Sequence, residues 1–155
     1  MTLLLLFVVS GFSRIADAQT LGPAQAGRHV QVATSSSAAP VRPGGALSLF
    51  VDITPNPGIH VYAPGATDYR PIALTLRPRA LKPVRYPKAE TLLFEKETVP
   101  VFQKPFRLIQ DVAIARSAKS GTTLTWKGTL DYQACDDKVC YLPVSVPVSW
   151  TVSVR

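Results

Sequence analysis

Prolines interrupt this chain so often that long regular elements are not expected. Fourteen of the 155 residues are proline, about twice the usual share of roughly 5%. Proline has no N–H and its ring disrupts a helix interior, so it confines strands to short or edge segments. With 46% hydrophobic and only 17% charged residues, the chain is too apolar to stay disordered. The pattern predicts short strands and turns, and it excludes a coiled coil, a helical bundle and a polytopic membrane protein.

Between the prolines, apolar residues recur with a period of two, which is typical of half-buried strands. The clearest examples are residues 46–53 and 144–154. Seven or more such strands predict a single all-β domain, an immunoglobulin-like antiparallel β-sandwich. We expect further strands over 29–33, 59–62, 72–76, 106–115 and 122–133, and a loop with one short strand over 90–104.

The first residues have the layout of a secretory signal peptide. An apolar core over 3–9 is followed by Ala16-Asp17-Ala18, an A-x-A cleavage signature. No basic residue precedes the apolar core, which leaves open an upstream start or an atypical signal. We expect a signal peptide over 1–18, a linker over 19–28 and one domain over 29–155, exported to a bacterial periplasm and not membrane-spanning once the signal is cleaved.

The charge of the chain does not indicate nucleic-acid binding. The formal net charge is +7, but the basic residues are scattered and separated by prolines, with no nucleic-acid-binding motif around them. The charge therefore predicts a solvated cationic surface.

Cys135 and Cys140 are the only cysteines, and in an exported protein disulfides persist. They flank a predicted four-residue hairpin loop over 136–139. Residues that oppose each other in an antiparallel ladder have Cα atoms about 4.5 or 5.5 Å apart, inside the window of roughly 4.4 to 6.8 Å for a disulfide. The two cysteines can therefore bond with little backbone movement.

The alternation of the two flanking strands places the cysteines on different faces. Cys135 shares the polar parity of its strand, whereas Cys140 shares the apolar parity of Val144. Bonded cysteines must lie on one face, so we expect a bulge or bend near Ala134 or Pro143.

Two interpretations of the pair remain open from the residues alone. A staple, that is, a disulfide that only stabilises the fold, is the ordinary role of a disulfide in an exported protein. Closing so short a loop, however, stabilises the fold by only about 2 kcal/mol. A redox pair would instead exchange with a partner protein. Neighbouring charges do not decide, because Asp136 and Asp137 disfavour a thiolate and Lys138 favours one. Two cysteines with the sequence-distant His29 and His60 make a poor metal site, so we expect neither metal nor organic cofactor.

Several segments together resemble a known family. The most specific are Tyr132-Gln133-Ala134-Cys135 and Cys140-Tyr141-Leu142-Pro143, and the others are 58–62, Tyr86-Pro87 and 94–106. They resemble the N-terminal periplasmic domain of the thiol:disulfide interchange protein DsbD, over roughly residues 30–154.

The resemblance implies an immunoglobulin-like fold in which Cys135 and Cys140 form the redox-active centre. Such a domain receives electrons from a thioredoxin-like reductant and passes them to periplasmic disulfide isomerases and cytochrome c maturation proteins, as a component of a protein-disulfide reductase. Cys140 matches the cysteine that joins to partners. Phe94 matches an aromatic residue that caps the disulfide, while His60 and Tyr62 match rings around the pair. Ordinary core packing is the alternative role for Phe94 and Tyr62.

Two departures from the family limit what the resemblance implies. The best-known member has five residues between its cysteines, and this chain has four. The family's membrane and thioredoxin-like domains are absent from this sequence, so we expect a separate reductant, with a membrane electron transporter as a candidate partner. The alternative function is a non-catalytic periplasmic immunoglobulin-like binding module with a structural hairpin disulfide.

Overall fold

Strands form where the sequence alternates, and turns form at the Pro- and Gly-rich segments between them. The computed structural model describes residues 25–26, 29–80, 82–94 and 96–155, so the expected signal peptide lies outside the described residues. No helix long and apolar enough to cross a membrane occurs in these ranges. The strands are β1 (Gln25–Ala26), β2 (Val30–Ser36), β3 (Ala46–Pro55), β4 (His60–Tyr62), β5 (Ala73–Arg77), β6 (Glu90–Phe94), β7 (Glu97–Phe102), β8 (Phe106–Ala113), β9 (Thr123–Tyr132), β10 (Ala134–Cys135) and β11 (Val144–Ser153).

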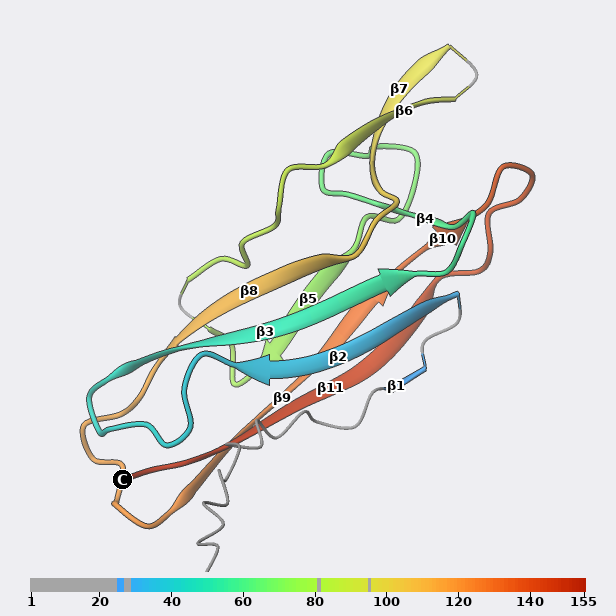
Figure 1. The fold of residues 1–155 in the computed structure, drawn as a ribbon. Coiled ribbons are helices and arrows are strands. Elements are labelled where there is room, and N and C mark those ends of the chain that lie inside the picture. Colours follow the sequence, from blue (N-terminus) through green and yellow to red (C-terminus); the bar gives the residue numbers. More distant parts are fainter. Residues whose placement is uncertain (1–24, 27–28, 81, 95) are drawn as a thin grey trace, which may run out of the picture.

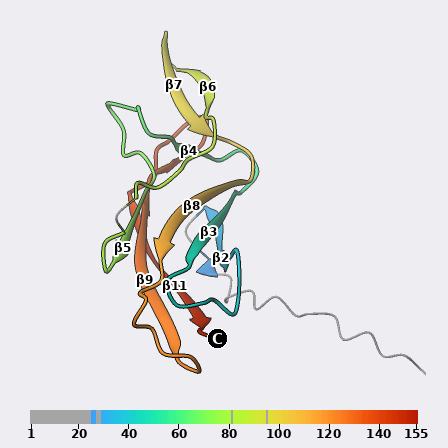
Figure 2. The same cartoon turned by 90° about the vertical axis from the view of Figure 1, so that its left-hand side faces the viewer.

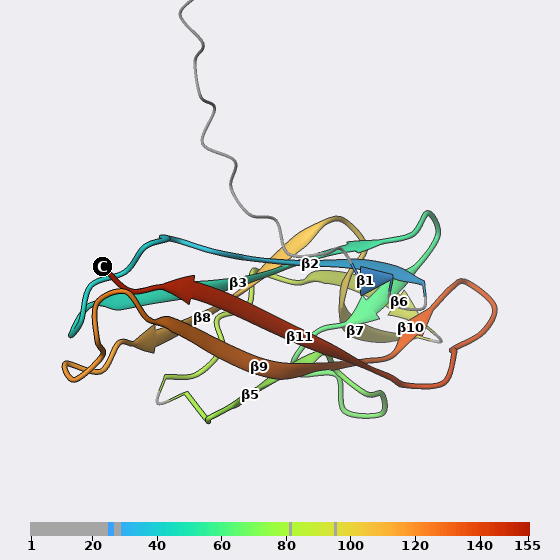
Figure 3. The ribbon, with the colours of Figure 1, turned by 90° about the horizontal axis from the view of Figure 1, so that it is seen from below.

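Two antiparallel sheets face each other across the core. One has the order β1-β2-β3-β8 and the other β11-β9-β5, and Figures 1 and 3 show them as two layers. The side chain of Trp150 joins the layers, since its Nε1 donates a hydrogen bond to the carbonyl oxygen of Phe50 at 3.0 Å. The expected immunoglobulin-like antiparallel β-sandwich is therefore confirmed.

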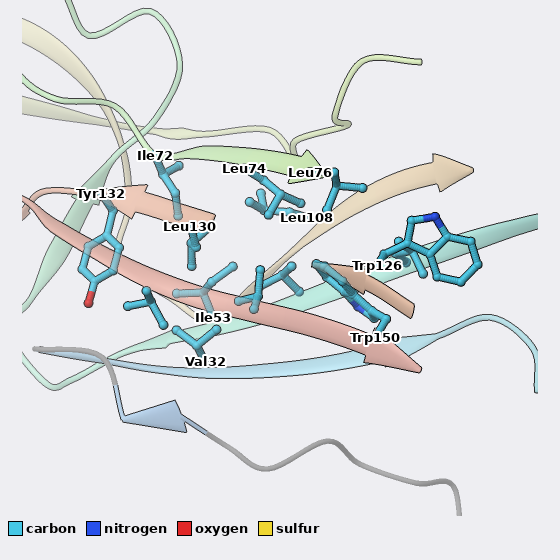
Figure 4. Packing of buried hydrophobic residues seen from close by; sticks show 14 of the residues in the cluster. Val32, Ile53, Ile72, Leu74, Leu76, Leu108, Trp126, Leu130, Tyr132 and Trp150 are labelled. Carbon is cyan, nitrogen blue, oxygen red and sulfur yellow. The ribbon is translucent and has the colours of Figure 1, made fainter. Parts of the chain in front are cut away.

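The apolar parity of each strand points into the space between the sheets. Figure 4 shows Val32 and Ile53 from one sheet packed against Leu130 and Trp150 from the other. In β3 and β11 the buried positions are those that the alternation predicts. Burial of these side chains removes apolar surface from water, and this stabilises the fold.

A third sheet, of order β10-β4-β7-β6, lies at one end of the sandwich. Its β6–β7 hairpin corrects the expectation of a loop with one short strand over 90–104, because both halves of that segment are strands. The hairpin projects beyond the two layers (Figure 2), so much of its surface faces solvent and its sequence shows no steady period. Leu93, for example, is 71% exposed.

The longest hairpin leads directly to the cysteines. β9 pairs with β11 from Thr123↔Ser153 to Tyr132↔Val144. Beyond Tyr132 the chain leaves this sheet, and β10 pairs with β4 in the third sheet instead. The cysteine loop is therefore held where two sheets meet.

Candidate redox site

Cys135 and Cys140 form a disulfide in the structure, with Cα atoms 4.1 Å apart. This separation is slightly below the window expected from a regular ladder. The two residues also form an antiparallel bridge with each other. The bond closes the loop over 136–139 at its base, as the sequence predicts.

One extra residue in the segment that follows the cysteine loop brings both cysteines to the same face. Tyr132 pairs with Val144, and Cys135 pairs with Cys140. Two residues (133–134) therefore oppose three (141–143), which is the arrangement of a β-bulge. The irregularity expected near Ala134 or Pro143 is present and resolves the conflict of parity.

The two sulfur-bearing residues differ sharply in exposure. Cys135 pairs with His60 across β10 and β4 and is only 1% exposed. Cys140 lies outside the strands and is exposed. A reagent in solution can therefore approach the disulfide from the Cys140 side.

The hydroxyl of Tyr62 faces both sulfurs. Tyr62 Oη lies 3.3 Å from Cys140 Sγ and 3.4 Å from Cys135 Sγ. Because the sulfurs of a disulfide carry no hydrogen, the phenol is the donor in this contact. Burial, together with the neighbouring Tyr69, raises the pKa of Tyr62 to about 12, so the hydroxyl keeps its proton. The ring of Tyr69 stacks on that of Tyr62 with centroids 4.1 Å apart.

His60 lies next to the pair but cannot act as a cation there at neutral pH. Its side chain is buried, and its ring meets the Tyr62 ring edge-on with centroids 5.4 Å apart. Burial lowers the pKa of His60, and the charges of Asp137 and Asp136 oppose that effect only in part. The imidazole is therefore neutral at pH 7 and contributes a ring rather than a charge.

Phe94 is the last residue of β6, where its backbone pairs with Glu97 at the tip of the β6–β7 hairpin. Its side chain lies outside what the structure describes. The hairpin and the cysteine loop extend from the same end of the molecule (Figures 1 and 3). The structure thus brings His60 and Tyr62 to the disulfide, and places the backbone of Phe94 at the same end.

A second set of contacts around the loop was not expected from the sequence. Asp136 Oδ1 accepts hydrogen bonds from the backbone N–H groups of Lys138 and Val139, both at 2.8 Å. Tyr141 Oη donates to Asp136 Oδ2 at 2.7 Å, and the ring of His29 stacks on that of Tyr141 at 3.7 Å. An Asp at the start of a turn could have been recognised as a loop-stabilising residue, but no sequence signal links it to Tyr141 or His29.

The hydrogen bond from Tyr141 and the two backbone bonds lower the pKa of Asp136 to about 2. The same carboxylate raises the pKa of Tyr141. At neutral pH this contact therefore joins an ionised carboxylate to a protonated phenol.

Exposed apolar side chains gather at the same end. Among the described residues, the large hydrophobic side chains exposed to solvent are Leu93 (71%), Val139 (52%) and Leu142 (81%). Val139 directly precedes Cys140, Leu142 lies two positions after it, and Leu93 lies on the β6–β7 hairpin. Within the described ranges, no three His, Cys, Asp or Glu side chains converge as metal ligands would.

Solved structures share this fold. The crystal structure of the reduced N-terminal domain of Neisseria meningitidis DsbD aligns with a TM-score of 0.51 at 17% identity, covering 81% of this chain and 92% of that one. The N-terminal periplasmic domain of ScsB from Proteus mirabilis aligns with a TM-score of 0.57 at 11% identity, covering 87% of this chain and 50% of that one. At these identities the likeness establishes the fold.

A search of curated protein sequences finds no significant match. The family model for the N-terminal region of the thiol:disulfide interchange protein DsbD matches residues 29–149, which include both cysteines and every strand from β2 to β10. The chain therefore belongs to the DsbD N-terminal domain family.

Proposed function

We propose that this chain is a periplasmic thiol–disulfide exchange domain. It passes electrons between a thioredoxin-like reductant and oxidised periplasmic proteins through Cys135 and Cys140, as a component of a protein-disulfide reductase. One observation carries the proposal: the disulfide joins an exposed residue, Cys140, which a partner can approach, to a buried residue, Cys135, whose sulfur lies beside a hydroxyl donor.

Reduction of the domain takes two exchange steps. A thiolate of the partner attacks Cys140 Sγ, the bond between the two cysteines breaks, and Cys135 leaves as a thiolate. The partner's second thiolate then attacks the partner sulfur of the mixed disulfide and releases Cys140. The partner ends as a disulfide, and this domain gains two electrons and two protons. The reverse sequence reduces an oxidised target.

Tyr62 supports the leaving sulfur. Its hydroxyl lies 3.4 Å from Cys135 Sγ and can donate to the thiolate that forms there. Hydrogen bonds to a charged acceptor are stronger than neutral ones, so this contact strengthens as charge develops on the sulfur. The pKa of about 12 ensures that the proton is present.

The surface around Cys140 fits a protein partner. Exposed apolar residues at Leu93, Val139 and Leu142 are the kind of surface that a transient protein interface covers. The ScsB domain that shares the fold is described as periplasmic, and this supports export of the chain after removal of a leader over 1–18. A separate thioredoxin-like protein, or a membrane electron transporter that carries such a domain, would supply the electrons.

Phe94 is proposed as a cap over the disulfide. The resemblance in sequence suggests this role, and the position of its backbone at the tip of β6–β7 supports it. A cap that partners displace would protect Cys140 from small thiols.

Trapping of a mixed disulfide tests the function. Cys135→Ala leaves the exposed Cys140 thiol and should form a mixed disulfide with a periplasmic thioredoxin-like protein. Cys140→Ala leaves only the buried thiol and should form far less. If neither variant forms one with any such protein, the exchange function is wrong and a structural disulfide remains.

The reduction potential separates exchange from a staple independently. A structural disulfide typically has a potential below about −300 mV, whereas the exchange-active pairs of thioredoxin-like proteins lie between about −270 and −120 mV. We expect a value clearly above this limit for the pair, measured by equilibration with glutathione or dithiothreitol. A potential below the limit would favour the staple.

A further inference from the structure

The cysteine loop is held closed by contacts other than the sulfur–sulfur bond. Both carboxylate oxygens of Asp136 are used, one by the N–H groups of Lys138 and Val139 and the other by the phenol of Tyr141. The ring of His29, from the segment before β2, covers the ring of Tyr141. We call Asp136, Tyr141 and His29 the loop clamp.

Backbone hydrogen bonds on either side of the cysteines connect the clamp to the sheet. Asp136 N donates to Val139 O at 3.0 Å, and Tyr141 N donates to Ala134 O at 2.9 Å. Gln133 Nε2 donates to the carbonyl oxygen of Tyr141 at 3.1 Å. Residues 133–141 are therefore held by hydrogen bonds in addition to the disulfide.

We propose that the loop clamp keeps Cys140 within reach of Cys135 when the bond between them is broken. Asp136 and Tyr141 thereby act as positioning residues that set the rate of the intramolecular exchange step. This inference rests on the proposed function, since it concerns the dithiol and mixed-disulfide states of the same pair.

The need for positioning follows from the unequal anchoring of the two cysteines. Cys135 is fixed by the pairing of β10 with β4, whereas Cys140 is exposed and lies outside the strands. In a mixed disulfide, the Cys135 thiolate attacks Cys140 Sγ, the pair re-forms, and the external thiolate leaves. Such a step depends on how often the two sulfurs meet in line, that is, on their effective concentration.

The loop clamp also affects the equilibrium between the dithiol and the disulfide, because closing the clamp and forming the disulfide are linked. A closed dithiol loop loses little freedom when the disulfide forms, so the clamp favours the disulfide. By reciprocity, the disulfide favours the clamp by the same factor. Removing the clamp should therefore lower the effective concentration of the two thiols.

Reaction of the fully reduced protein with the aromatic disulfide DTNB measures both steps. In the first step a protein thiolate attacks the reagent, forms a mixed disulfide and releases one coloured thiolate. In the second step the other cysteine displaces the second coloured thiolate and restores the Cys135–Cys140 bond. The first phase depends on reagent concentration and the second does not. Cys135→Ala should abolish the second phase and so identifies it.

Tyr141→Phe is the main variant, because it removes the hydroxyl and keeps the ring that stacks on His29. We expect the second phase to slow by about fivefold, the factor that corresponds to loss of one hydrogen bond of typical net strength, while the first phase keeps its rate. The effective concentration measured with glutathione should fall by the same factor, which makes the potential less negative by about 20 mV.

Matched variants separate geometry from charge. Asp137→Asn removes one negative charge from the neighbouring carboxylate, which accepts no hydrogen bond within the described loop. It should speed the first phase with the anionic reagent and leave the second unchanged. Asp136→Asn keeps an oxygen that accepts from the two N–H groups and gains an amide N–H that can donate to the phenol. The rate of its second phase should therefore stay within about twofold of that of the unmodified protein. Asp136→Ala removes all of these contacts and should slow the second phase as Tyr141→Phe does.

Each result bears on the proposal. Equal second phases in the unmodified protein, Tyr141→Phe and Asp136→Ala overturn it. Equal slowing by Asp136→Asn and Asp136→Ala also overturns it, because charge alone would then act. If a variant loses the near-ultraviolet circular dichroism of the fold, His29→Ala, which removes only the stacking ring, takes its place and should slow the second phase. Absence of any second phase in the unmodified protein would contradict the proposed function itself.

Discussion

A single phenol distinguishes this disulfide from an ordinary surface crosslink. Tyr62 Oη lies within 3.4 Å of both sulfurs, and the pKa of about 12 keeps it protonated. Because Cys135 is buried and Cys140 is exposed, this hydroxyl is placed to donate to the Cys135 sulfur, where the proposed exchange would form negative charge. At the scale of the residue, the proposed reactivity rests on the different surroundings of two identical side chains.

The proposed cap makes a prediction at the scale of one residue. Phe94→Ala should increase the rate at which dithiothreitol reduces the disulfide, because a small thiol no longer has to displace the ring. Leu93→Ala is the matched control, since it removes an exposed apolar side chain from the adjacent position and should leave this rate unchanged. An unchanged rate in Phe94→Ala would exclude Phe94 from the site.

His60 should make the stability of the fold depend on pH. Burial lowers the pKa of His60 in the folded protein below its ordinary value of 6.5. Between the two pKa values the unfolded chain binds a proton that the folded protein does not. The free energy of unfolding should therefore be at its full value above pH 6.5 and decrease as the pH falls below it.

Urea denaturation at a series of pH values from 8 to about 5 measures this effect. His60→Phe keeps an aromatic ring beside Tyr62 and cannot titrate, so its free energy of unfolding should decrease less over the same range. The carboxylates titrate in both proteins and cancel in the comparison. Parallel curves for the two proteins would show that His60 does not cause the decrease.

At the scale of elements, the central strand β9 carries both the core and the approach to the site. It pairs with β11 on one side and with β5 on the other. Gly128 permits this close approach, because a Cβ at that position would lie 2.6 Å from the carbonyl oxygen of Thr75. Only glycine fits at this position, because a larger residue would place its Cβ against the backbone of β5, which cannot move aside.

Gly128→Ala should therefore destabilise the β5–β9 pairing. We expect a loss of about 1–3 kcal/mol in the free energy of unfolding, the usual cost of overpacking. Lys127→Ala, at the neighbouring exposed position of the same strand, should change it by less than about 0.5 kcal/mol. Urea denaturation of the two variants checks this. Similar losses in both would show that the close approach does not limit the substitution.

At the scale of the whole molecule, the sandwich has a core that does not depend on the disulfide. The bonded cysteines are only five positions apart and lie at one end, whereas the main cluster fills the space between the two large sheets (Figure 4). On the chain-entropy model, so short a loop stabilises by about 2 kcal/mol. We therefore expect the domain to keep its fold when the bond is reduced.

Reduction should leave the protein folded. We expect the near-ultraviolet circular dichroism of the buried Trp126 and Trp150 to persist in the dithiol form. The free energy of unfolding should decrease by about 2 kcal/mol or less, and the double variant Cys135→Ala, Cys140→Ala should behave in the same way. If the protein unfolds when it is reduced, the disulfide is structural rather than redox-active.

Much of the sandwich could be predicted because its strands carry their own pattern. Residues 46–53 and 144–154 alternate strictly, since one face meets the core and the other meets water. Residues 90–104 were predicted less well, because only the base of their hairpin is buried: Val101 is fully buried, whereas Leu93 near the tip is 71% exposed. Alternation of apolar residues reports which side chains are buried, so it does not predict a strand where few side chains are buried.

The sequence by itself determined the strand-rich fold, the ability of its only two cysteines to bond and the need for an irregularity between them. These properties depend on local alternation and on short separations along the chain. Only the tertiary structure decided which cysteine is exposed, that Tyr62 faces both sulfurs, and that His29 and Tyr141 meet beside the loop. Those contacts join segments as distant as 112 positions, and their geometry follows from how the sheets pack, which no local pattern encodes.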